Sequence, residues 1–183
     1  MLVSFLDFDD VLNSYSYFSG TKVQELKQLK RFSQFEDHER LDEKAVKIYN
    51  NFVKRTNAKT IISSNWRHYH STEELTRLLR KVGFEGDVIG KTPSGTNEID
   101  LDLLERYRLR GTIRWRTGSF PFCIRGHLIF QRVIEMNLSP EQIVIFDDRD
   151  DMNPLESRLI QTEETEGLTE AHIEQAYRLL GLT

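Results

Sequence analysis

The chain has 183 residues, of which 38% are hydrophobic and 30% are charged, with a formal net charge of −4. This composition excludes a disordered chain and predicts a single domain over residues 1–183, and the negative charge excludes a general attraction to nucleic acid, although not a local basic patch. With one cysteine and neither a signal-peptide core nor an apolar run of membrane-spanning length, we expect a soluble, cytoplasmic monomer without a membrane partner, although export by a non-cleaved route stays open.

The first dozen residues predict a buried strand that ends on acids. Residues 2–6 form an apolar run whose length favours a strand over a helix. Asp7 and Asp9 follow it, and an extended chain would turn both carboxylates to the same side. Such a pair repels unless a cation or a shared proton relieves it, and Mg²⁺ prefers oxygen ligands. In the alternative interpretation, Asp9 and Asp10 form a polar turn that caps the next element, and this stretch alone does not decide between the two.

Residues 14–40 predict an insert beside the acidic loop. Three aromatic residues follow that loop, and residues 22–32 are predicted to form a short helix. The insert is too short to be a separate domain. A small cap over the site and a surface helix packed on aromatic side chains are both compatible with this pattern.

A second strand is predicted to end in hydroxyl groups. Helices are predicted over 41–55 and 71–82, with Asp42 as the N-cap of the first and Ser71 or Thr72 as that of the second. The apolar run 58–62 lies between them. It ends in Ser63 and Ser64, with Arg67 shortly after. Hydroxyls and an arginine at a strand tip can hold a phosphate, and the serines could instead cap the following helix. Val88-Ile89 predicts a further short strand.

Residues 95–124 predict a second insert with a basic hairpin. Residues 106–116 alternate on either side of Gly111-Thr112, which is typical of a two-residue turn. One face of this hairpin would carry five arginines: Arg106, Arg108, Arg110, Arg114 and Arg116. These could recognise a phosphorylated or polyanionic partner, or they could prevent edge-to-edge association of the hairpin.

A second acidic strand follows a predicted helix over 125–136. Four apolar residues, 143–146, lead into Asp147 and Asp148. In an open parallel sheet, ligands bind outside the carboxyl ends of the strands. Two strands that each end in acids could therefore place up to four carboxylates around one point, which a solvated turn does not explain. An edge strand over 158–161 and a last helix capped by Thr169 complete the predicted chain.

These stretches resemble the haloacid dehalogenase (HAD) superfamily of phosphohydrolases. The motifs that carry the resemblance are Asp7-Phe-Asp9, Ser63-Ser64 and Ile145-Phe-Asp147-Asp148, which look like motifs I, II and IV. The segments that resemble the HAD domain of RNA-repair-type proteins are Thr56 to Arg67, Gly90-Lys-Thr-Pro93, Arg125-Gly126 and Gln161 to Thr169. The end of the last motif, Asp147-Asp148-Arg149, is also similar to polynucleotide 3′-phosphatase domains. The resemblance implies a three-layer α/β Rossmann-like fold, with a mostly parallel sheet, helices on both faces and a small cap.

The resemblance also implies a chemistry, a Mg²⁺-dependent phosphomonoester hydrolysis through a phospho-aspartate. It makes Asp7 the nucleophile and Asp9 the general acid and base. The implied metal ligands are Asp7, the backbone carbonyl of Asp9, and Asp147 or Asp148. The implied phosphate-binding residues are Ser63 or Ser64 and Arg125, with Lys91 and Arg132 as alternatives to Arg125. Arg67 joins them because of its place behind the hydroxyl tip. A nucleotide, a nucleic-acid end, a phosphoprotein or a small metabolite would suit this chemistry as substrate.

One position departs from the family pattern. Asp10 stands where the family usually has glycine, at a point that needs an unusual backbone turn. Aspartate tolerates a positive φ better than most residues, so we expect the turn to be preserved. The competing functional class is a degenerate HAD module that binds a phosphorylated partner without turnover, and the acids at every motif position weigh against it.

Overall fold

A five-stranded sheet forms the centre of the computed structural model, which describes residues 1–29, 31, 34–94, 96–107, 114–116, 120–122 and 125–182. The strand order is β3-β2-β1-β6-β7, and all four pairings are parallel. The strands are β1 (Val3–Leu6), β2 (Lys59–Ile62), β3 (Val88–Lys91), β6 (Ile143–Asp147) and β7 (Leu159–Gln161). The predicted α/β class with a mostly parallel sheet is confirmed.

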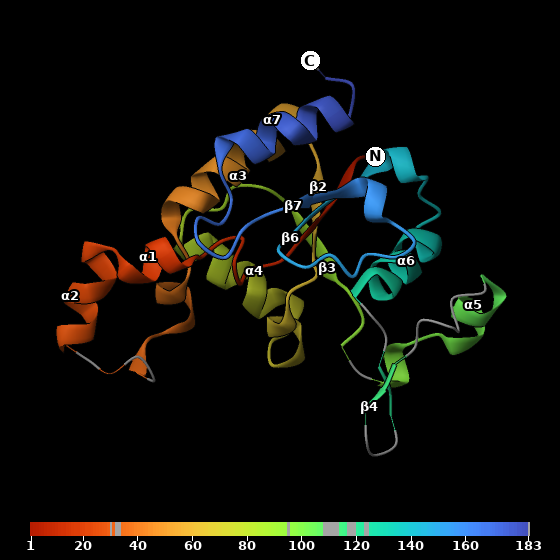
Figure 1. Cartoon of the computed structure of the whole chain (residues 1–183), viewed down its shortest axis with the longest axis horizontal. Helices are drawn as coiled ribbons and strands as arrows, with labels where there is room; N and C mark the ends of the chain where they lie inside the picture. The colour runs from red at the N-terminus through yellow and green to blue at the C-terminus, as the bar shows by residue number, and fades with distance from the viewer. Residues whose placement is uncertain are drawn as a thin grey trace.

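The helices connect these strands (Figure 1). They are α1 (Tyr15–Ser19), α2 (Thr21–Leu29), α3 (Glu43–Thr56), α4 (Thr72–Lys81), α5 (Leu101–Arg106), α6 (Arg125–Glu135) and α7 (Glu170–Leu179). The Asp42 carboxylate caps α3 by accepting from Lys44 N–H at 2.9 Å, and Ser71 caps α4, as predicted. Among the described residues, no helix has the length and apolar character needed to cross a bilayer.

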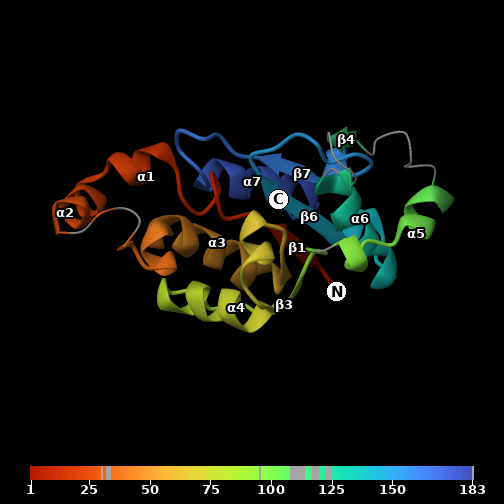
Figure 2. The same ribbon diagram turned by 90° about the horizontal axis from the view of Figure 1, so that it is seen from below.

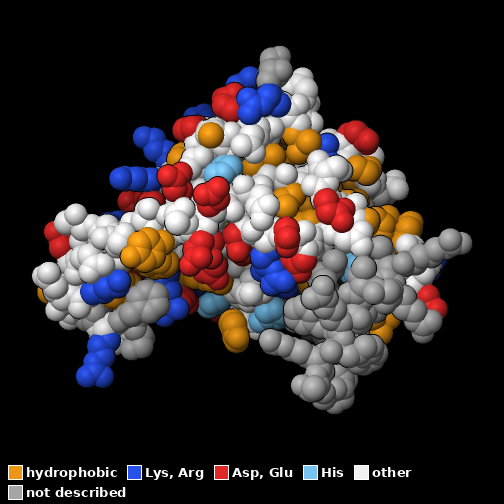
Figure 3. Space-filling view, in the orientation of Figure 1, with side chains coloured by type: hydrophobic (Ala, Val, Ile, Leu, Met, Phe, Trp, Pro, Cys, Tyr) orange, Lys and Arg blue, Asp and Glu red, His pale blue; other side chains and the backbone are white. Residues whose placement is uncertain are grey.

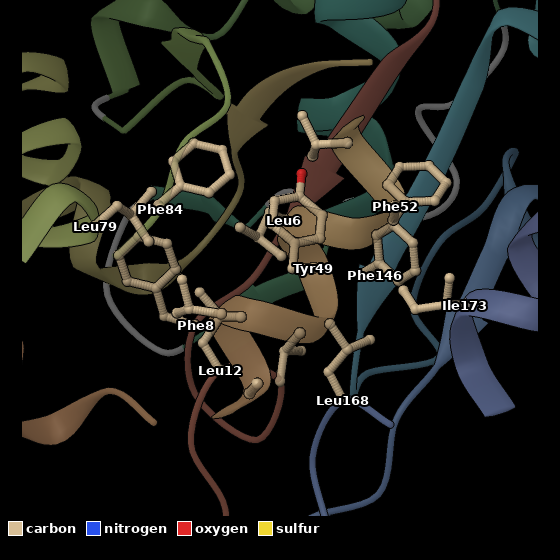
Figure 4. Packing of buried hydrophobic residues seen from close by; sticks show 14 of the residues in the cluster. Leu6, Phe8, Leu12, Tyr49, Phe52, Leu79, Phe84, Phe146, Leu168 and Ile173 are labelled. Atoms are coloured by element: carbon tan, nitrogen blue, oxygen red, sulfur yellow. The ribbon is translucent and has the colours of Figure 1, made fainter. Parts of the chain in front are cut away.

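Helices pack on both faces of the sheet and make three layers (Figure 2). On one face, buried side chains from α3, α4 and α7 form a core with alternate strand residues such as Leu6, Ile62 and Phe146. Several aromatic rings pack together in this core, where Tyr49 lies among Phe52, Phe84 and Phe146 (Figure 4). The other strand residues, Val3, Phe5, Ile61, Ile143 and Ile145, pack against Ile129 and Val133 of α6. Strand alternation therefore decides which residues face which layer.

The first insert differs from its predicted form. Instead of one helix over 22–32, the chain forms α1 and α2. Residues 30 and 32 of the predicted span lie outside the described part. Ser14 caps α1, because its hydroxyl accepts from Tyr17 N–H at 3.2 Å. Of the apolar residues in α2, Val23 is buried, whereas Leu29 is 84% exposed. A polar N-cap earlier in the chain thus starts the helical segment sooner than hydrophobic spacing alone predicts.

The predicted hairpin around Gly111-Thr112 is wrong in its position. Arg106 belongs to α5, which Asp100 caps by accepting from Leu103 N–H at 2.8 Å. The antiparallel pair is instead β4 (Arg114–Arg116) with β5 (Phe120–Phe122). Burial of Leu103 and Leu104 of α5 with Leu128 of α6 favours helix here over the alternating pattern. Arg108, Arg110 and the turn residues lie outside the described residues, as do the side chains of Arg114 and Arg116.

Candidate active site

Three polar residues lie in a row where the central strands end. Asp7 N–H donates to the carbonyl of Phe146 at 3.0 Å, and Ser63 N–H donates to the carbonyl of Leu6 at 2.8 Å. This continues the parallel register beyond β1, β2 and β6, so that Asp7, Ser63 and Asp147 lie at one level. The residues two positions earlier, which pack against α6, are Phe5, Ile61 and Ile145. Because side chains alternate along a strand, the three polar side chains also point to the face of the sheet that α6 covers.

Arg125, the first residue of α6, lies directly over this row. Its side chain is buried, and its Nη1 donates to a carboxylate oxygen of Asp7 and to Oδ2 of Asp147, the latter at 2.7 Å. Its Nη2 donates to Asn65 Oδ1 at 3.4 Å. Burial of the guanidinium lowers the pKa of Arg125, but the neighbouring carboxylates of Asp7 and Asp147 together have the larger effect and raise it overall. One fixed cation thus joins the ends of β1 and β6.

The two alternatives to Arg125 lie elsewhere. Lys91 Nζ donates to the carbonyls of Arg67 and His70 at 2.8 and 3.0 Å. Arg132 donates from Nε to the Lys91 carbonyl at 3.0 Å and pairs with Glu135 at 2.7 Å. Of the three predicted cations, Arg125 is therefore the one that contacts Asp7.

Asp7, Asp147 and Asp148 form a group of carboxylates that could hold a metal ion. One ligand atom from each lies within 4.8 Å of the other two. Burial and the neighbouring Asp7 raise the pKa of Asp147 to about 7, although Arg125 acts in the opposite direction. The same two causes raise the pKa of Asp148. One arginine does not offset three carboxylates, and oxygen ligands with excess negative charge fit a hard divalent cation.

Asp9 lies beside this group rather than in it. Its side chain is exposed, and each of its oxygens accepts one hydrogen bond. Asn13 Nδ2 donates to Oδ1 at 3.1 Å, and the indole Nε1 of Trp66 donates to Oδ2 at 3.0 Å. The Asp9 carboxylate is absent from the metal-binding group of the described residues, so its predicted metal contact remains the backbone carbonyl.

Asp10 has the expected left-handed backbone. Its φ is 58°, and its N–H donates to Asn13 Oδ1 at 2.8 Å while its carbonyl accepts from Thr162 Oγ1 at 2.8 Å. Burial, with Asp148 and Glu164 nearby, raises the pKa of Asp10 to about 6. Acidic side chains gather near the centre of the face seen in Figure 3, over the loops that follow β1 and β6.

The predicted phosphate-binding residues after β2 have different surroundings. Ser63 Oγ is buried and has no hydrogen-bond partner among the described residues. Ser64 is the N-cap of a 3₁₀ segment, η3 (Asn65–His68), and its Oγ accepts from Trp66 N–H at 3.4 Å. Arg67 is buried and donates to the carbonyls of Ser63, Ser64 and Pro93 at 3.0, 2.8 and 3.0 Å. Ser63 therefore has a hydroxyl available to a ligand, whereas Arg67 ties the loop after β2 to the one after β3.

The start of α6 is fixed by a residue that the sequence did not single out. Asp151 Oδ2 accepts from Arg125 N–H at 3.2 Å, and its carbonyl accepts from Gly126 N–H at 2.9 Å. A side chain at Gly126 would collide with the backbone of Met152. Asp151 also binds Arg149 through two hydrogen bonds, of 2.8 and 2.6 Å. The close contact of Gly126 with the backbone of Met152, together with the hydrogen bonds to Asp151, places Arg125 over Asp7 and Asp147.

Asn13, Asn65 and Trp66 were likewise not predicted as site residues. Asn13 lies four positions after Asp9, a spacing that can close a turn, and this was its one local signal. Trp66 and Asn65 follow the predicted hydroxyl tip, but their partners are 57 and 60 residues away in the sequence. Only the pairing of the strands brings these side chains to Asp9 and Arg125.

Of the comparisons with known proteins, the one with protein families finds a match. No curated protein and no solved structure matches the chain. A family model described as the HAD domain in Swiss Army Knife RNA repair proteins matches residues 3–173. The match runs from the first residue of β1 into α7 and includes every residue of the site described above. The chain therefore belongs to the family of HAD domains found in Swiss Army Knife RNA repair proteins.

Proposed function

We propose that this HAD domain is a Mg²⁺-dependent phosphomonoester hydrolase that works through a phospho-aspartate on Asp7. The observation that carries the proposal is the buried Arg125, which joins Asp7 and Asp147 while Asp148 completes a three-carboxylate group. Membership of a HAD family supports hydrolase activity of this type.

In the first step, an oxygen of Asp7 attacks phosphorus and the bond to the leaving oxygen breaks. Asp9 gives its proton to that leaving oxygen, so the product departs as an alcohol. In the second step, Asp9 takes a proton from a water molecule, which attacks the phosphorus and displaces Asp7. Inorganic phosphate leaves, and both aspartates return to their starting forms. Two carboxyl groups are needed because the nucleophile is occupied by phosphorus when the proton must move.

Arg125 and Ser63 are the proposed contacts of the phosphoryl group. The Arg125 guanidinium offsets the repulsion between the Asp7 carboxylate and the incoming phosphate. The hydroxyl of Ser63, which has no hydrogen-bond partner in the described part of the chain, faces the layer that contains α6 and can donate to a phosphoryl oxygen. Ser64 and Arg67 are not assigned this role, because their polar atoms already cap η3 and bind carbonyl groups.

Asp7, Asp147, Asp148 and the backbone carbonyl of Asp9 would hold Mg²⁺. When bound, the ion supplies charge stabilisation for the phosphoryl group in the transition state. Burial and repulsion by Asp7 raise the pKa of Asp147 to about 7, which supports this assignment, because a divalent cation would favour the charged form of this carboxylate.

We also propose that residues 14–40 act as a small cap beside the site. Asn13 and Ser14 lead directly from the acidic loop into α1. Tyr15 N–H donates to the Glu164 carbonyl at 2.9 Å and Ser16 N–H to the Thr165 carbonyl at 3.0 Å, which anchors the insert to the loop after β7. A cap so placed would restrict which phosphate esters reach Asp7.

The proposed substrate class is a phosphorylated nucleic-acid end. The description of the matched family, which concerns RNA repair proteins, supports this choice over a phosphoprotein or a metabolite. The test is phosphate release from an aryl phosphate and from oligoribonucleotides phosphorylated at the 3′ or the 5′ end, with and without Mg²⁺. Mg²⁺-dependent release from the aryl ester and from one oligonucleotide is expected. Phosphate binding without any turnover would contradict the proposal and favour a binding module.

A further inference from the structure

The carboxylate of Asp9 is held at both ends by neutral N–H groups. Asn13 Nδ2 lies 3.1 Å from its Oδ1, and Trp66 Nε1 lies 3.0 Å from its Oδ2. We infer that Asn13 and Trp66 are positioning residues for proton transfer by Asp9, an inference that rests on the proposed function. They fix the carboxyl group where it meets the leaving oxygen in the first step and the attacking water in the second.

The Asp9 side chain needs these two hydrogen bonds because packing around it restrains it little. The side chain is exposed and follows the end of β1, so packing does not select one rotamer. General acid catalysis requires the proton donor within hydrogen-bond reach of its target. A freely rotating carboxyl group would meet that requirement only part of the time.

The chemistry of the two donors suits a group that gains and loses a proton. An indole N–H and an amide N–H neither titrate near neutral pH nor accept a proton from Asp9. Each carboxylate oxygen has a second lone pair, so either oxygen can carry the proton while both donors remain bound. The restraint can therefore persist through both steps of the reaction.

Asn13 is itself fixed in orientation. Its side chain is 3% exposed, its Oδ1 accepts from Asp10 N–H at 2.8 Å, and its Nδ2 also donates to the Arg40 carbonyl at 3.2 Å. If the amide were reversed, its NH₂ group would face the Asp10 N–H, and its oxygen would face the Arg40 carbonyl and the Asp9 carboxylate. The hydrogen bonds thus determine which end of Asn13 points to Asp9.

Trp66 is fixed from two sides. Its backbone N–H bonds to Ser64 Oγ at 3.4 Å in η3, and its ring packs edge-on against Phe8, with centroids 5.4 Å apart and planes at 71°. Phe8 is the residue between Asp7 and Asp9. Trp66 therefore links the loop after β2 to the acidic loop after β1. A Phe substitution would keep an aromatic ring beside Phe8, although a smaller one, while removing the N–H.

The experiment uses Trp66→Phe and the rapid kinetics of an aryl phosphate. The aryl leaving group departs without a proton, so formation of phospho-Asp7, seen as a burst of phenol, should stay near the wild-type rate. Steady-state turnover depends on Asp9 as base and should fall by about 10-fold. This is less than the roughly 10²- to 10⁴-fold that acid–base catalysis contributes as a whole, because Asp9 itself remains. For an alkyl phosphate, which needs the proton, the first step should slow as well.

Three further variants make the outcome specific. Adding Trp66→Phe to Asp9→Asn should cause no further loss, because the residue acts through Asp9. Tyr69→Phe, a change at an exposed ring two residues after Arg67, should retain the wild-type burst and turnover with the aryl ester. Asn13→Asp keeps the acceptor for Asp10 N–H but puts a carboxylate oxygen in place of the donor to Asp9. Loss of the donor and the added repulsion should both displace the Asp9 carboxyl group, so turnover should fall more than the burst rate.

The outcomes separate this inference from the proposed function. If the wild-type protein shows a burst, and Trp66→Phe has the same burst rate and the same turnover, the positioning role is overturned. The assignment of Asp7 as nucleophile would be unaffected. Equal slowing of burst and turnover would also overturn it, since a general disturbance of the site predicts that pattern. Absence of a burst and of turnover in the wild-type protein would instead reject the phospho-aspartate mechanism.

Discussion

Arg125 and Asp7 form a buried ion pair between residues that lie 118 positions apart in the chain. Asp7 follows the central strand β1, and Arg125 begins the helix that packs on one face of the sheet. Arg125 also pairs with Asp147, so one cation serves two buried carboxylates.

Asp7→Asn should abolish turnover and preserve the fold. The substitution leaves one buried carboxylate, Asp147, for the single guanidinium, so the free energy of unfolding without metal should be equal or higher. Thermal unfolding and phosphate release with an aryl ester measure the two effects. Turnover that survives in Asp7→Asn would rule out Asp7 as nucleophile.

Mg²⁺ should raise the unfolding temperature of the wild-type protein. A ligand that binds only the folded state adds about 2.7 kcal/mol at a concentration of 100 times its Kd. Asp147→Asn and Asp148→Asn should reduce the shift, because each removes one carboxylate of the group of three. Asp150→Asn is the matched control, since Asp150 is exposed and lies outside that group. An equal Mg²⁺ shift in all four proteins would contradict the assigned ligands.

Asp9→Asn should separate phosphate binding from turnover. The variant should still bind beryllofluoride on Asp7, because the nucleophile, Arg125 and the metal-binding carboxylates are unchanged. Turnover should fall by roughly 10²- to 10⁴-fold, the usual worth of general acid–base catalysis. A smaller loss with an alkyl phosphate, whose leaving group needs a proton, would assign the acid to another residue.

The free energy of unfolding should decrease at acidic pH because of His172, near the start of α7. His172 Nδ1 accepts a hydrogen bond from Thr169 N–H at 3.0 Å at the start of α7. Burial lowers the pKa of His172 below its ordinary value of 6.5, although Glu163 and Glu166 act in the opposite direction. The unfolded chain therefore binds the proton more readily, and stability is lost as the pH falls through that value.

His172→Gln tests this pH dependence, because glutamine offers an acceptor that does not titrate. The variant should lose less stability than wild type between about pH 7 and about pH 5, by up to about 1 kcal/mol, the usual worth of a capping interaction. Burial also lowers the pKa of His127, so part of the acid sensitivity should remain. Identical pH profiles for both proteins would refute the role of His172.

The ends of the strands were predictable from sequence, because each motif is a short apolar run closed by acids or hydroxyls. The register of β1, β2 and β6 then brings Asp7, Ser63 and Asp147 to one level, as expected for parallel strands. Asp10 also adopts the predicted positive φ. These features are local, or follow from sheet geometry alone.

Contacts between separate loops were not predictable. Nothing near Trp66 indicates that its indole reaches Asp9, and nothing near Asp151 indicates that it fixes the start of α6. The alternating pattern around residue 111 was misleading, because the burial of Leu103 and Leu104 extends a helix to Arg106. In each case tertiary packing decides, and no sequence window contains both partners.

The central claim, a phospho-aspartate on Asp7, can be measured directly. The wild-type protein is mixed with Mg²⁺ and an aryl phosphate, quenched in acid within the first turnover, and reduced with borohydride, which converts an aspartyl phosphate to homoserine. Peptide mass spectrometry should find homoserine at position 7, and none in protein treated without substrate. Turnover with an unmodified Asp7, or with the modification on another carboxylate, would contradict the mechanism.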